Sequence, residues 1–340
     1  MAVKAAARRC VLVIVAPWLL SAQALSPYVD VHAHLDGDNV EGSIQAVLEA
    51  MPRENLARII FMPAPYTMND ASRFDTEVML AAAKKHPGKV AVLGGGGTLN
   101  PIIQQSVESG DAGPEVQRKF KTRAEELLRL GAVGFGEMTA EHFAAATPYQ
   151  YAPPDHPLFL LLAEIAAQHG VPIDLHMEAV PQDMPLPSDL RSPPNPPRLR
   201  ENIAAFERLL AHRSRAGIIW AHAGSDRTGY RTPELCRRLL QAHPNLYVEI
   251  KIDPADVGRN SPLVNGASGG IKSEWVKLFE DFPGRFVIGS DQHYPEPKSA
   301  TQRWQAAVLL LNQLPAELRR KIGIENAESI YRGGGQKPDR

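Results

Sequence analysis

The chain has 340 residues, of which 44% are hydrophobic and 22% are charged, and its formal net charge is −1. This balance is that of a globular protein with a sizeable core. The near-zero charge gives no bulk electrostatic attraction to nucleic acid or to an anionic membrane, so neither is expected as a partner.

The first 24 residues have the composition of a secretory signal peptide. Lys4, Arg8 and Arg9 precede the short apolar run CVLVIVAPWLL, and Ala22-Gln23-Ala24 offers small residues for cleavage. The apolar run is short for a bilayer span, which needs about 20 residues. We therefore predict an exported protein, periplasmic or secreted, with no stable membrane span once residues 1–24 are removed. An uncleaved interfacial anchor or a poorly ordered tail is the alternative.

Eight short apolar runs occur in residues 25–340, separated by amphipathic helical segments. The runs are YVDVHAH, ARIIFMP, KVAVLGG, GAVGFGEM, VPIDLHM, AGIIWAH, LYVEIKI and RFVIGSD. Strict alternation of strands and helices favours parallel strands with helices outside, and eight units predict one α/β domain, a (β/α)₈ TIM barrel. A doubly wound open sheet is the alternative.

Several predicted helices end in histidine just before the next strand. His86, His169, His212 and His243 occur in KKHPGKV, AQHGVPI, LLAHRSRAG and QAHPNLY. A histidine suits the negative end of a helix, and Pro or Gly stops the helix there. We interpret these four histidines as structural.

Residues 180–200, VPQDMPLPSDLRSPPNPPRLR, form a proline-rich segment after the fifth run. So many prolines exclude a regular helix or a central strand. The segment is interpreted as a long loop over the active face, with a decorative surface loop as the alternative. Whether it is a lid is left open.

Metal-ligand residue types recur at the end of the apolar runs, where active sites of such barrels gather. They are His32 and His34, Glu137, His176, His222 and Asp291. His32 and His34 lie two apart on a strand and so share one face. Imidazole and carboxylate suit Zn²⁺ and also Mn²⁺, Fe²⁺ or Co²⁺, and a catalytic ion lowers the pKa of bound water from about 15.7 toward about 7.

The motifs VDVHAH, GFGEM, DLHME, WAHAG, IGSDQH and ENAESIYR resemble the metal-dependent amidohydrolase superfamily. The resemblance implies a distorted TIM barrel in which His32, His34 and Asp291 hold one metal ion. His176 and His222 would hold a second ion, or orient the substrate if only one is bound. Asp291 would also take a proton from the attacking water.

Glu137 has two interpretations under this resemblance. Some superfamily members place a carboxylated lysine at the end of the fourth strand, and others place a glutamate there. Glu137 is expected to bridge two ions, and the alternative is a hydrogen-bonding or substrate-contacting residue beside one ion.

Further polar residues near the strand ends are candidates for substrate binding. Lys251 shares a strand face with Glu249, and His293 follows Asp291 closely. Arg227 and Arg231 follow the sixth run, where an arginine can clamp a carboxylate or phosphate, or simply lie on the surface. We keep Arg227, Lys251 and His293 as substrate-binding candidates. His142 and His156 are placed in the loop after the fourth run, without a role.

The sequence therefore predicts a metal-dependent hydrolase that cleaves an amide, lactone or other ester bond of a small molecule, and a homo-oligomer is compatible with it. A phosphoesterase would depend on the arginines after the sixth run. A single-metal non-oxidative decarboxylase would bind about one ion without needing Glu137 as a ligand. A metal- or solute-binding barrel without catalysis is the non-enzyme alternative.

Overall fold

The computed structural model describes residues 26–35, 39–66, 76–143, 148–191, 195–213, 215–252, 261–266, 268–294 and 303–332. The predicted signal peptide, residues 1–24, lies outside the described residues. Within them, no helix is both long and apolar enough to cross a membrane.

All eight apolar runs form strands at the centre of the molecule. They are β1 (Tyr28–Leu35), β2 (Leu56–Phe61), β3 (Val90–Val92) with β4 (Gly94–Gly95), β5 (Phe135–His142), β7 (Ile173–Met177), β10 (Ile218–Ala223), β11 (Leu246–Ile250), and β12 (Phe286–Ile288) with β13 (Gln292–Tyr294). Neighbouring strands of the ring pair in parallel. The predicted (β/α)₈ barrel is confirmed.

The ring consists of two hydrogen-bonded sheets, β13-β1-β2-β3 and β12-β11-β10-β7-β5-β4. One junction is the continuous run of β3 and β4, with only Leu93 between them. At the other junction, between β12 and β13, the Asp291 N–H donates to the carbonyl oxygen of His32 at 2.8 Å. This hydrogen bond ties the last strand run to the first and brings residues far apart in sequence together.

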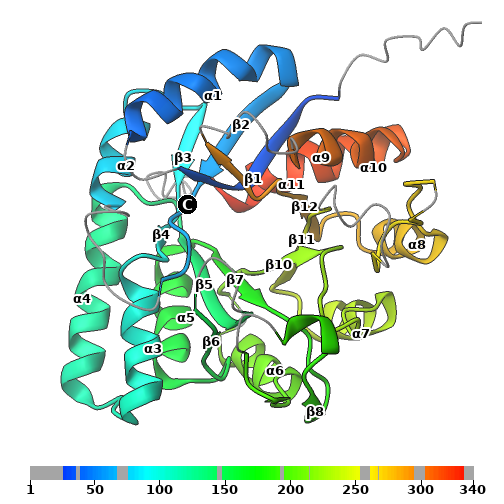
Figure 1. Ribbon diagram of the computed structural model, residues 1–340. Helices are drawn as coiled ribbons and strands as arrows, with labels where there is room; N and C mark the ends of the chain where they lie inside the picture. The colour runs from blue at the N-terminus through cyan, green and yellow to red at the C-terminus, as the bar shows by residue number, and fades with distance from the viewer. Residues whose placement is uncertain are drawn as a thin grey trace, which may run out of the picture.

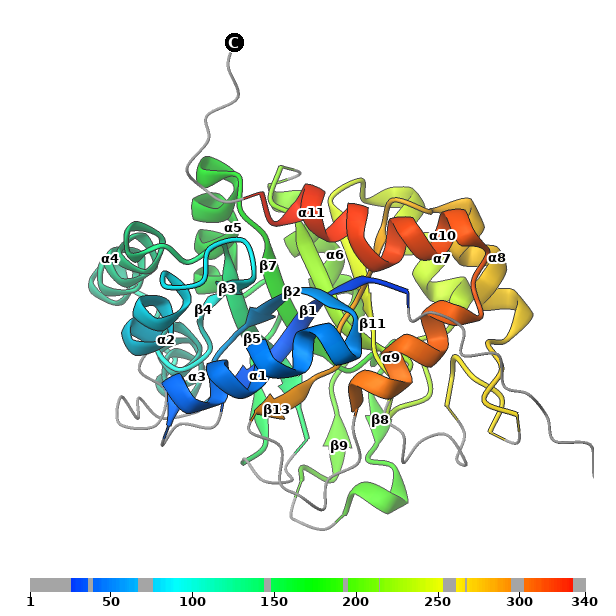
Figure 2. The ribbon, with the colours of Figure 1, turned by 90° about the horizontal axis from the view of Figure 1, so that it is seen from above.

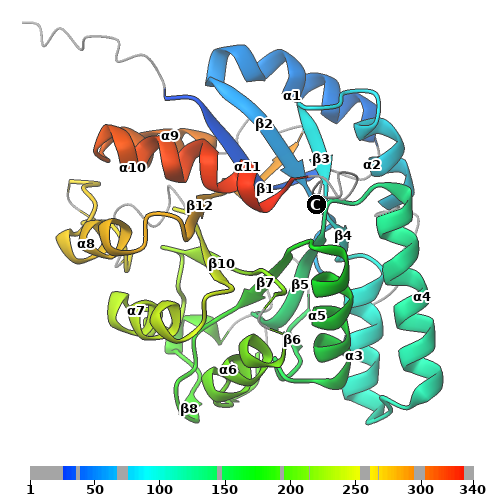
Figure 3. The ribbon, with the colours of Figure 1, turned by 180° about the vertical axis from the view of Figure 1, so that it is seen from behind.

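Helices surround the strands on the outside (Figures 1 and 3). They are α1 (Val40–Glu54), α2 (Thr76–Ala83), α3 (Leu99–Ser109), α4 (Pro114–Leu130), α5 (Pro157–His169), α6 (Ile203–His212), α7 (Pro233–Ala242), α8 (Ser273–Asp281), α9 (Arg303–Asn312), α10 (Ala316–Arg320) and α11 (Asn326–Ile330). Proline at the first helical position starts α4, α5 and α7, because its missing N–H would be unpaired there anyway. His169 and His212 are the last residues of α5 and α6, as predicted.

The barrel interior changes from apolar to polar along its axis. Inward-facing residues of the lower interior, including Val29, Ile60, Leu93 and Val287, pack in one cluster with Tyr331. Tyr331 directly follows α11 and is fully buried. This apolar packing fills the barrel interior below the candidate ligand residues, so the polar groups lie directly above a layer of packed apolar side chains.

The proline-rich segment contains short regular elements. β8 (Met184–Pro185) pairs antiparallel with β9 (Arg198–Leu199), and a 3₁₀ turn spans Ser188–Leu190. Leu186, Leu190 and Leu199 pack with Phe143 and Val180 in a separate apolar cluster. Figure 2 shows β8 and β9 extending from the same end of the barrel as β13. The described part of this segment is therefore packed against Phe143, the residue that directly follows β5.

Candidate metal centre

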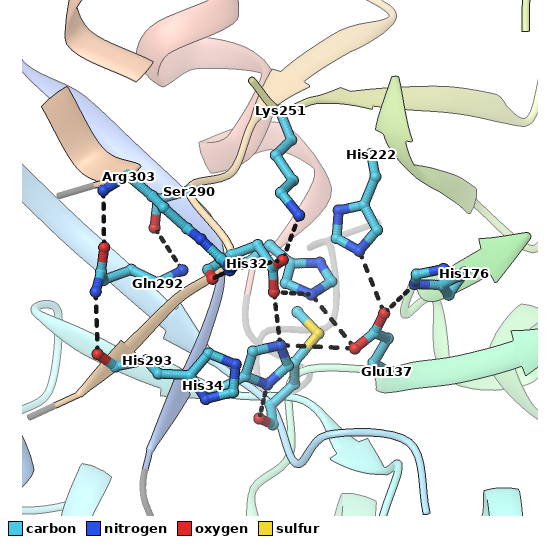
Figure 4. Close-up of polar contacts among 12 residues, drawn as sticks. His32, His34, Glu137, His176, His222, Lys251, Ser290, Gln292, His293 and Arg303 are labelled. Carbon is cyan, nitrogen blue, oxygen red and sulfur yellow. Dashed lines mark hydrogen bonds and ion pairs between the residues drawn. The ribbon is translucent and has the colours of Figure 1, made fainter. Parts of the chain in front are cut away.

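Six side chains that the sequence predicts as metal ligands converge at the carboxyl-terminal end of the barrel (Figure 4). Two groups of three ligand atoms each lie within 4.8 Å of one another. One group is His32, His34 and Asp291, and the other is His32, Glu137 and His222. All of these residues except Asp291 are buried, and Asp291 has intermediate burial.

A register shift in β1 directs its two histidines inward. Pairing between β1 and β2 is irregular between Asp30 and Ala33. Val29 and Val31 belong to the interior cluster below, whereas Ala33 packs outward in the core under the helices. Because of this irregularity, His32 and His34 continue the inward face above the valines. The two-residue spacing placed the histidines on a common face, but the bulge decides that this face is the interior.

The Glu137 carboxylate lies in the middle of the cluster. Its Oε1 is 2.6 Å from His176 Nδ1 and 3.2 Å from His222 Nε2. Its Oε2 is 3.6 Å from Nε2 of both His32 and His34. One oxygen therefore faces each pair of histidines, an arrangement that suits a carboxylate shared by two sets of ligands.

The β1 histidines are oriented by acceptors behind their rings. Nδ1 of His34 is 2.9 Å from the carbonyl oxygen of Met62. A carbonyl only accepts, so this Nδ1 carries a proton and Nε2 is directed into the site. Nδ1 of His32 is 3.5 Å from Oδ2 of the fully buried Asp174. A carboxylate in this position fixes the tautomer and makes the imidazole a better metal ligand.

His222 on β10 has the same arrangement. Its Nδ1 is 3.2 Å from Oε2 of Glu249, and its backbone N–H donates to that oxygen as well. Glu249 is fully buried on β11. The carboxylate therefore holds both the ring and the backbone of His222, and directs Nε2 toward Glu137.

The donor set fits a divalent metal ion. Both ring nitrogens of His32, both carboxylate oxygens of Asp174 and Oε1 of Glu249 are buried without a hydrogen-bond partner among the described residues. Burial lowers the pKa of His32, but Asp174 and Glu137 together raise it well above its ordinary value. The cluster therefore stabilises positive charge at its centre, and imidazole and carboxylate are donors that suit a catalytic divalent ion.

Two of the candidate ligands have left-handed backbone conformations. The φ angle is 68° at His222 and 53° at Asp291. This region is unfavourable for residues with a Cβ, and such residues concentrate at functional sites. Close packing is also required at Gly289, where a Cβ would lie 2.6 Å from the Cβ of His32 and would collide with Glu249.

Asp291 connects the histidines to two cations. Its Oδ1 is 3.0 Å from His34 Nε2, whereas its Oδ2 accepts from Lys251 Nζ and, at 3.0 Å, from Arg303 Nη1. Burial raises the pKa of Asp291, but the Lys251 ammonium and the neighbouring histidines lower it well below its ordinary value. The carboxylate is therefore ionised and held in one orientation.

Two more histidines flank the predicted ligands. The ring of His293 is 4.7 Å from that of His34, and the ring of His142 is 4.7 Å from that of His176, measured between centroids. Burial lowers the pKa of His293 to about 4. His142 is the last residue of β5 rather than a loop residue, so the prediction is wrong there: the strand extends four residues beyond the predicted run GAVGFGEM. His156 is the N-cap of α5.

The arginines after β10 differ from each other. Arg231 is only 2% exposed, and its guanidinium donates to the carbonyl oxygens of Ala221 and Met177. It is therefore neither a substrate clamp nor a surface residue, because its donors hold the backbone of two strands. Arg227 is exposed, and its backbone N–H donates to Glu178 at 3.0 Å.

Three residues of the site had no predicted role. Asp174 precedes His176 by two residues, so a buried acid at this spacing within a strand is a usable signal. Glu249 shares a strand face with Lys251, a pattern that predicts no role for Glu249 itself. Arg303 begins α9, and no local pattern links it to Asp291.

The family profile described as Amidohydrolase matches residues 107–333, more than half of the chain. The chain belongs to the amidohydrolase family. This family lies within a superfamily of metal-dependent enzymes, in agreement with the ligand cluster above.

Solved structures share the fold of this amidohydrolase at low sequence identity. A 2,6-dihydroxybenzoate decarboxylase from Rhizobium is 13% identical over 90% of this chain and 99% of its own, with a TM-score of 0.54. An amidohydrolase II is 13% identical with the same coverage and a TM-score of 0.51. A protein in which organophosphate hydrolysis activity was engineered from a weak promiscuous lactonase template is 15% identical over 91% of this chain and 96% of its own. Its TM-score is 0.50. No curated protein matches the chain.

Proposed function

We propose that this amidohydrolase is an exported hydrolase that cleaves an amide, lactone or other ester bond of a small molecule, with Zn²⁺ as its metal. The observation that carries the proposal is the position of Glu137, whose two carboxylate oxygens face different pairs of histidines. This arrangement supports two ions that share Glu137. His32, His34 and Asp291 would hold one ion, and His176 and His222 the other.

A bound divalent ion supplies Lewis-acid polarisation of the substrate oxygen and lowers the pKa of water. Asp291 accepts the proton of the attacking water at Oδ1, on the histidine side of its carboxylate, and returns it to the leaving group. Lys251 and Arg303 hold Oδ2 and so keep Oδ1 directed at the site.

The carboxylates behind the histidines orient the imidazole rings. The carboxylates of Asp174 and Glu249 lie 3.5 Å and 3.2 Å from the Nδ1 atoms of His32 and His222 and keep their Nε2 atoms directed at the centre. Neither carboxylate is exposed to solvent, so substrate does not reach them.

The test begins with metal content. Elemental analysis of the purified protein should give about two ions per chain, and His32→Ala and Glu137→Gln should each lower that value. His212→Ala, at the opposite end of the barrel, is the matched control and should keep the wild-type content. Wild-type protein should then hydrolyse members of a panel of amides, lactones and carboxylic esters.

Product analysis separates this proposal from its rivals. Release of CO₂ from aromatic or unsaturated acids, with about one ion per chain and no effect of Glu137→Gln on metal content, would replace hydrolysis by decarboxylation. Turnover of phosphoesters alone would make the enzyme a phosphoesterase. Full metal content without turnover on any class would favour a binding barrel.

A further inference from the structure

Lys251 is a largely buried cation with unused hydrogen-bonding capacity. It directly follows β11, and its side chain is 10% exposed. An ammonium group has three N–H donors. Within the described residues, the recorded acceptor for Lys251 Nζ is Asp291 Oδ2 alone. A buried ammonium with two further donors is costly unless another acceptor completes its shell.

The direction of the side chain indicates where that acceptor would come from. Figure 4 shows Lys251 extending toward the histidine cluster. Its Nζ donates to Asp291 Oδ2. Asp291 Oδ1, on the other side of the same carboxylate, is 3.0 Å from His34 Nε2. The free donors of Lys251 are therefore within a few ångströms of the candidate metal ligands, where a substrate must bind.

A second cation, Arg303, contacts the same Oδ2 atom of Asp291. Arg303 Nη1 is 3.0 Å from Asp291 Oδ2, and the Arg303 side chain is 31% exposed. Because both cationic groups are within hydrogen-bond reach of one oxygen, they are no more than about 6 Å apart. A carboxylate group is small enough to contact both. Arg303 reaches this point from α9 and Lys251 from β11, so the pair depends on the tertiary structure.

The opposite side of the cluster has a different character. There Glu137 Oε1 faces His176 and His222, and the His142 ring packs on His176. The two cations, Lys251 and Arg303, both contact Asp291. A bound anion therefore has a preferred orientation toward the Asp291 side of the cluster.

We propose that Lys251, assisted by Arg303, binds a carboxylate of the substrate, so that the substrates of this enzyme are small carboxylic acids carrying the bond to be cleaved. The inference rests on the proposed function only for the type of bond. It adds the charge of the substrate and the end of the site that receives that charge.

The test measures binding of glutarate and of its uncharged dimethyl ester to the zinc-loaded protein by calorimetry. The measured quantity is the ratio of the ester dissociation constant to the glutarate dissociation constant. Lys251→Met keeps the length of the side chain and removes its charge, and we expect it to lower this ratio at least tenfold. Arg303→Met should lower it by a smaller factor. Lys277→Met is the matched control, because Lys277 lies exposed on α8 in an ion pair with Asp281, and it should leave the ratio unchanged.

Zinc alone can also attract a carboxylate, and this possibility has its own outcome. A ratio that is the same in wild type and Lys251→Met means that the metal alone selects the acid, and overturns the inference. If Lys251→Met fails to retain zinc, Lys251→Gln replaces it. Glutamine removes the charge but its amide can still donate to Asp291, so an unchanged ratio in zinc-loaded Lys251→Gln also overturns the inference, and a lowered ratio supports it.

The outcomes distinguish this inference from the proposed function. Hydrolysis of uncharged and acidic substrates alike, with no effect of Lys251→Met on their relative kcat/KM, leaves the function and removes the inference. Lys251-dependent binding of glutarate, without hydrolysis of any amide, lactone or ester, removes the function and leaves the inference.

Discussion

Histidines at the two ends of the barrel show how position decides the role of one residue type. At the carboxyl-terminal end, His32 and His222 are buried, and each has a buried carboxylate behind its Nδ1. At the amino-terminal end, His212 closes α6, and its Nε2 is 3.0 Å from Glu164, with both side chains partly exposed. Each pair joins an imidazole to a carboxylate.

The difference between the two ends is the solvent. Water screens the pair of His212 and Glu164, and such surface pairs contribute about 0–1 kcal/mol. In the interior, the same contact fixes a tautomer and stabilises positive charge. An imidazole–carboxylate pair alone therefore does not indicate function. A pair that is buried and lies among other converging ligand-type side chains does.

The largest effect is expected at Asp291. Asp291→Asn removes the proposed proton acceptor and the charge of one proposed ligand, so kcat/KM should fall by about 10²–10⁴-fold on any substrate that the wild type hydrolyses. His212→Ala, at the other end, should retain wild-type kcat/KM. Similar rates for Asp291→Asn and wild type would remove Asp291 from the reaction.

Glu141 shows the effect of burial on a carboxyl group that is outside the ligand cluster. It lies above the barrel on β5, with Tyr149 Oη at 2.8 Å and Asn202 Nδ2 at 3.0 Å. Burial raises the pKa of Glu141 to about 7, from an unfolded value near 4.5. The folded state therefore binds more protons between pH 4.5 and 7, so this group lowers the free energy of unfolding as the pH rises through that window.

Glu141→Gln should remove this loss, because a glutamine can accept from Asn202 and donate to Tyr149. Chemical denaturation should show equal stability of variant and wild type near pH 4 and a more stable variant at pH 8, by on the order of 3 kcal/mol. Glu108→Gln, on the exposed end of α3, is the control. A variant that is less stable than wild type at pH 8 would contradict the assignment of a protonated Glu141.

Two glycines near β12 differ in the space available for a side chain at the two ends of the barrel. Gly289 lies beside His32 and Glu249, whereas a Cβ at Gly284, before β12, would meet no atom within 4 Å. Gly289→Ala should destabilise the fold by about 1–3 kcal/mol and lower zinc content, because His32 must move. Gly284→Ala should change neither quantity. Thermal unfolding and elemental analysis measure both, and equal behaviour of the two variants would show that the site tolerates displacement of His32.

Asp174 tests the carboxylate behind His32. Asp174→Asn should weaken zinc binding by about 10–100-fold, because the ring of His32 loses its anionic partner. Competition with a chromophoric chelator measures the affinity. Glu164→Gln makes the matched change behind His212 and should leave zinc affinity unaltered. Equal affinities in the two variants would mean that burial of the carboxylate adds nothing at the metal centre.

The smallest effect is expected for the surface pair itself. His212→Ala should change the free energy of unfolding by less than about 1 kcal/mol and leave metal content intact. Denaturant titration at pH 7 provides the measurement. A larger loss would show that the amino-terminal end is more tightly coupled to the barrel than its exposure suggests.

The (β/α)₈ barrel can be predicted from the sequence alone, because strand and helix periodicities depend on neighbouring residues. The sequence also indicated His32, His34, Glu137, His222 and Asp291, since each is a ligand-type residue at or near the end of an apolar run, and these ends meet in a closed barrel.

The tertiary structure decided which groups stand behind and beside those ligands. The bulge in β1, the contact of Asp174 with His32 and the approach of Arg303 to Asp291 depend on pairings between segments far apart in the chain. Arg231 illustrates the same limit, because its donors are used by strand carbonyls that only the folded chain brings to it. Local patterns specify what each segment becomes, whereas burial and charge arise only when the segments meet.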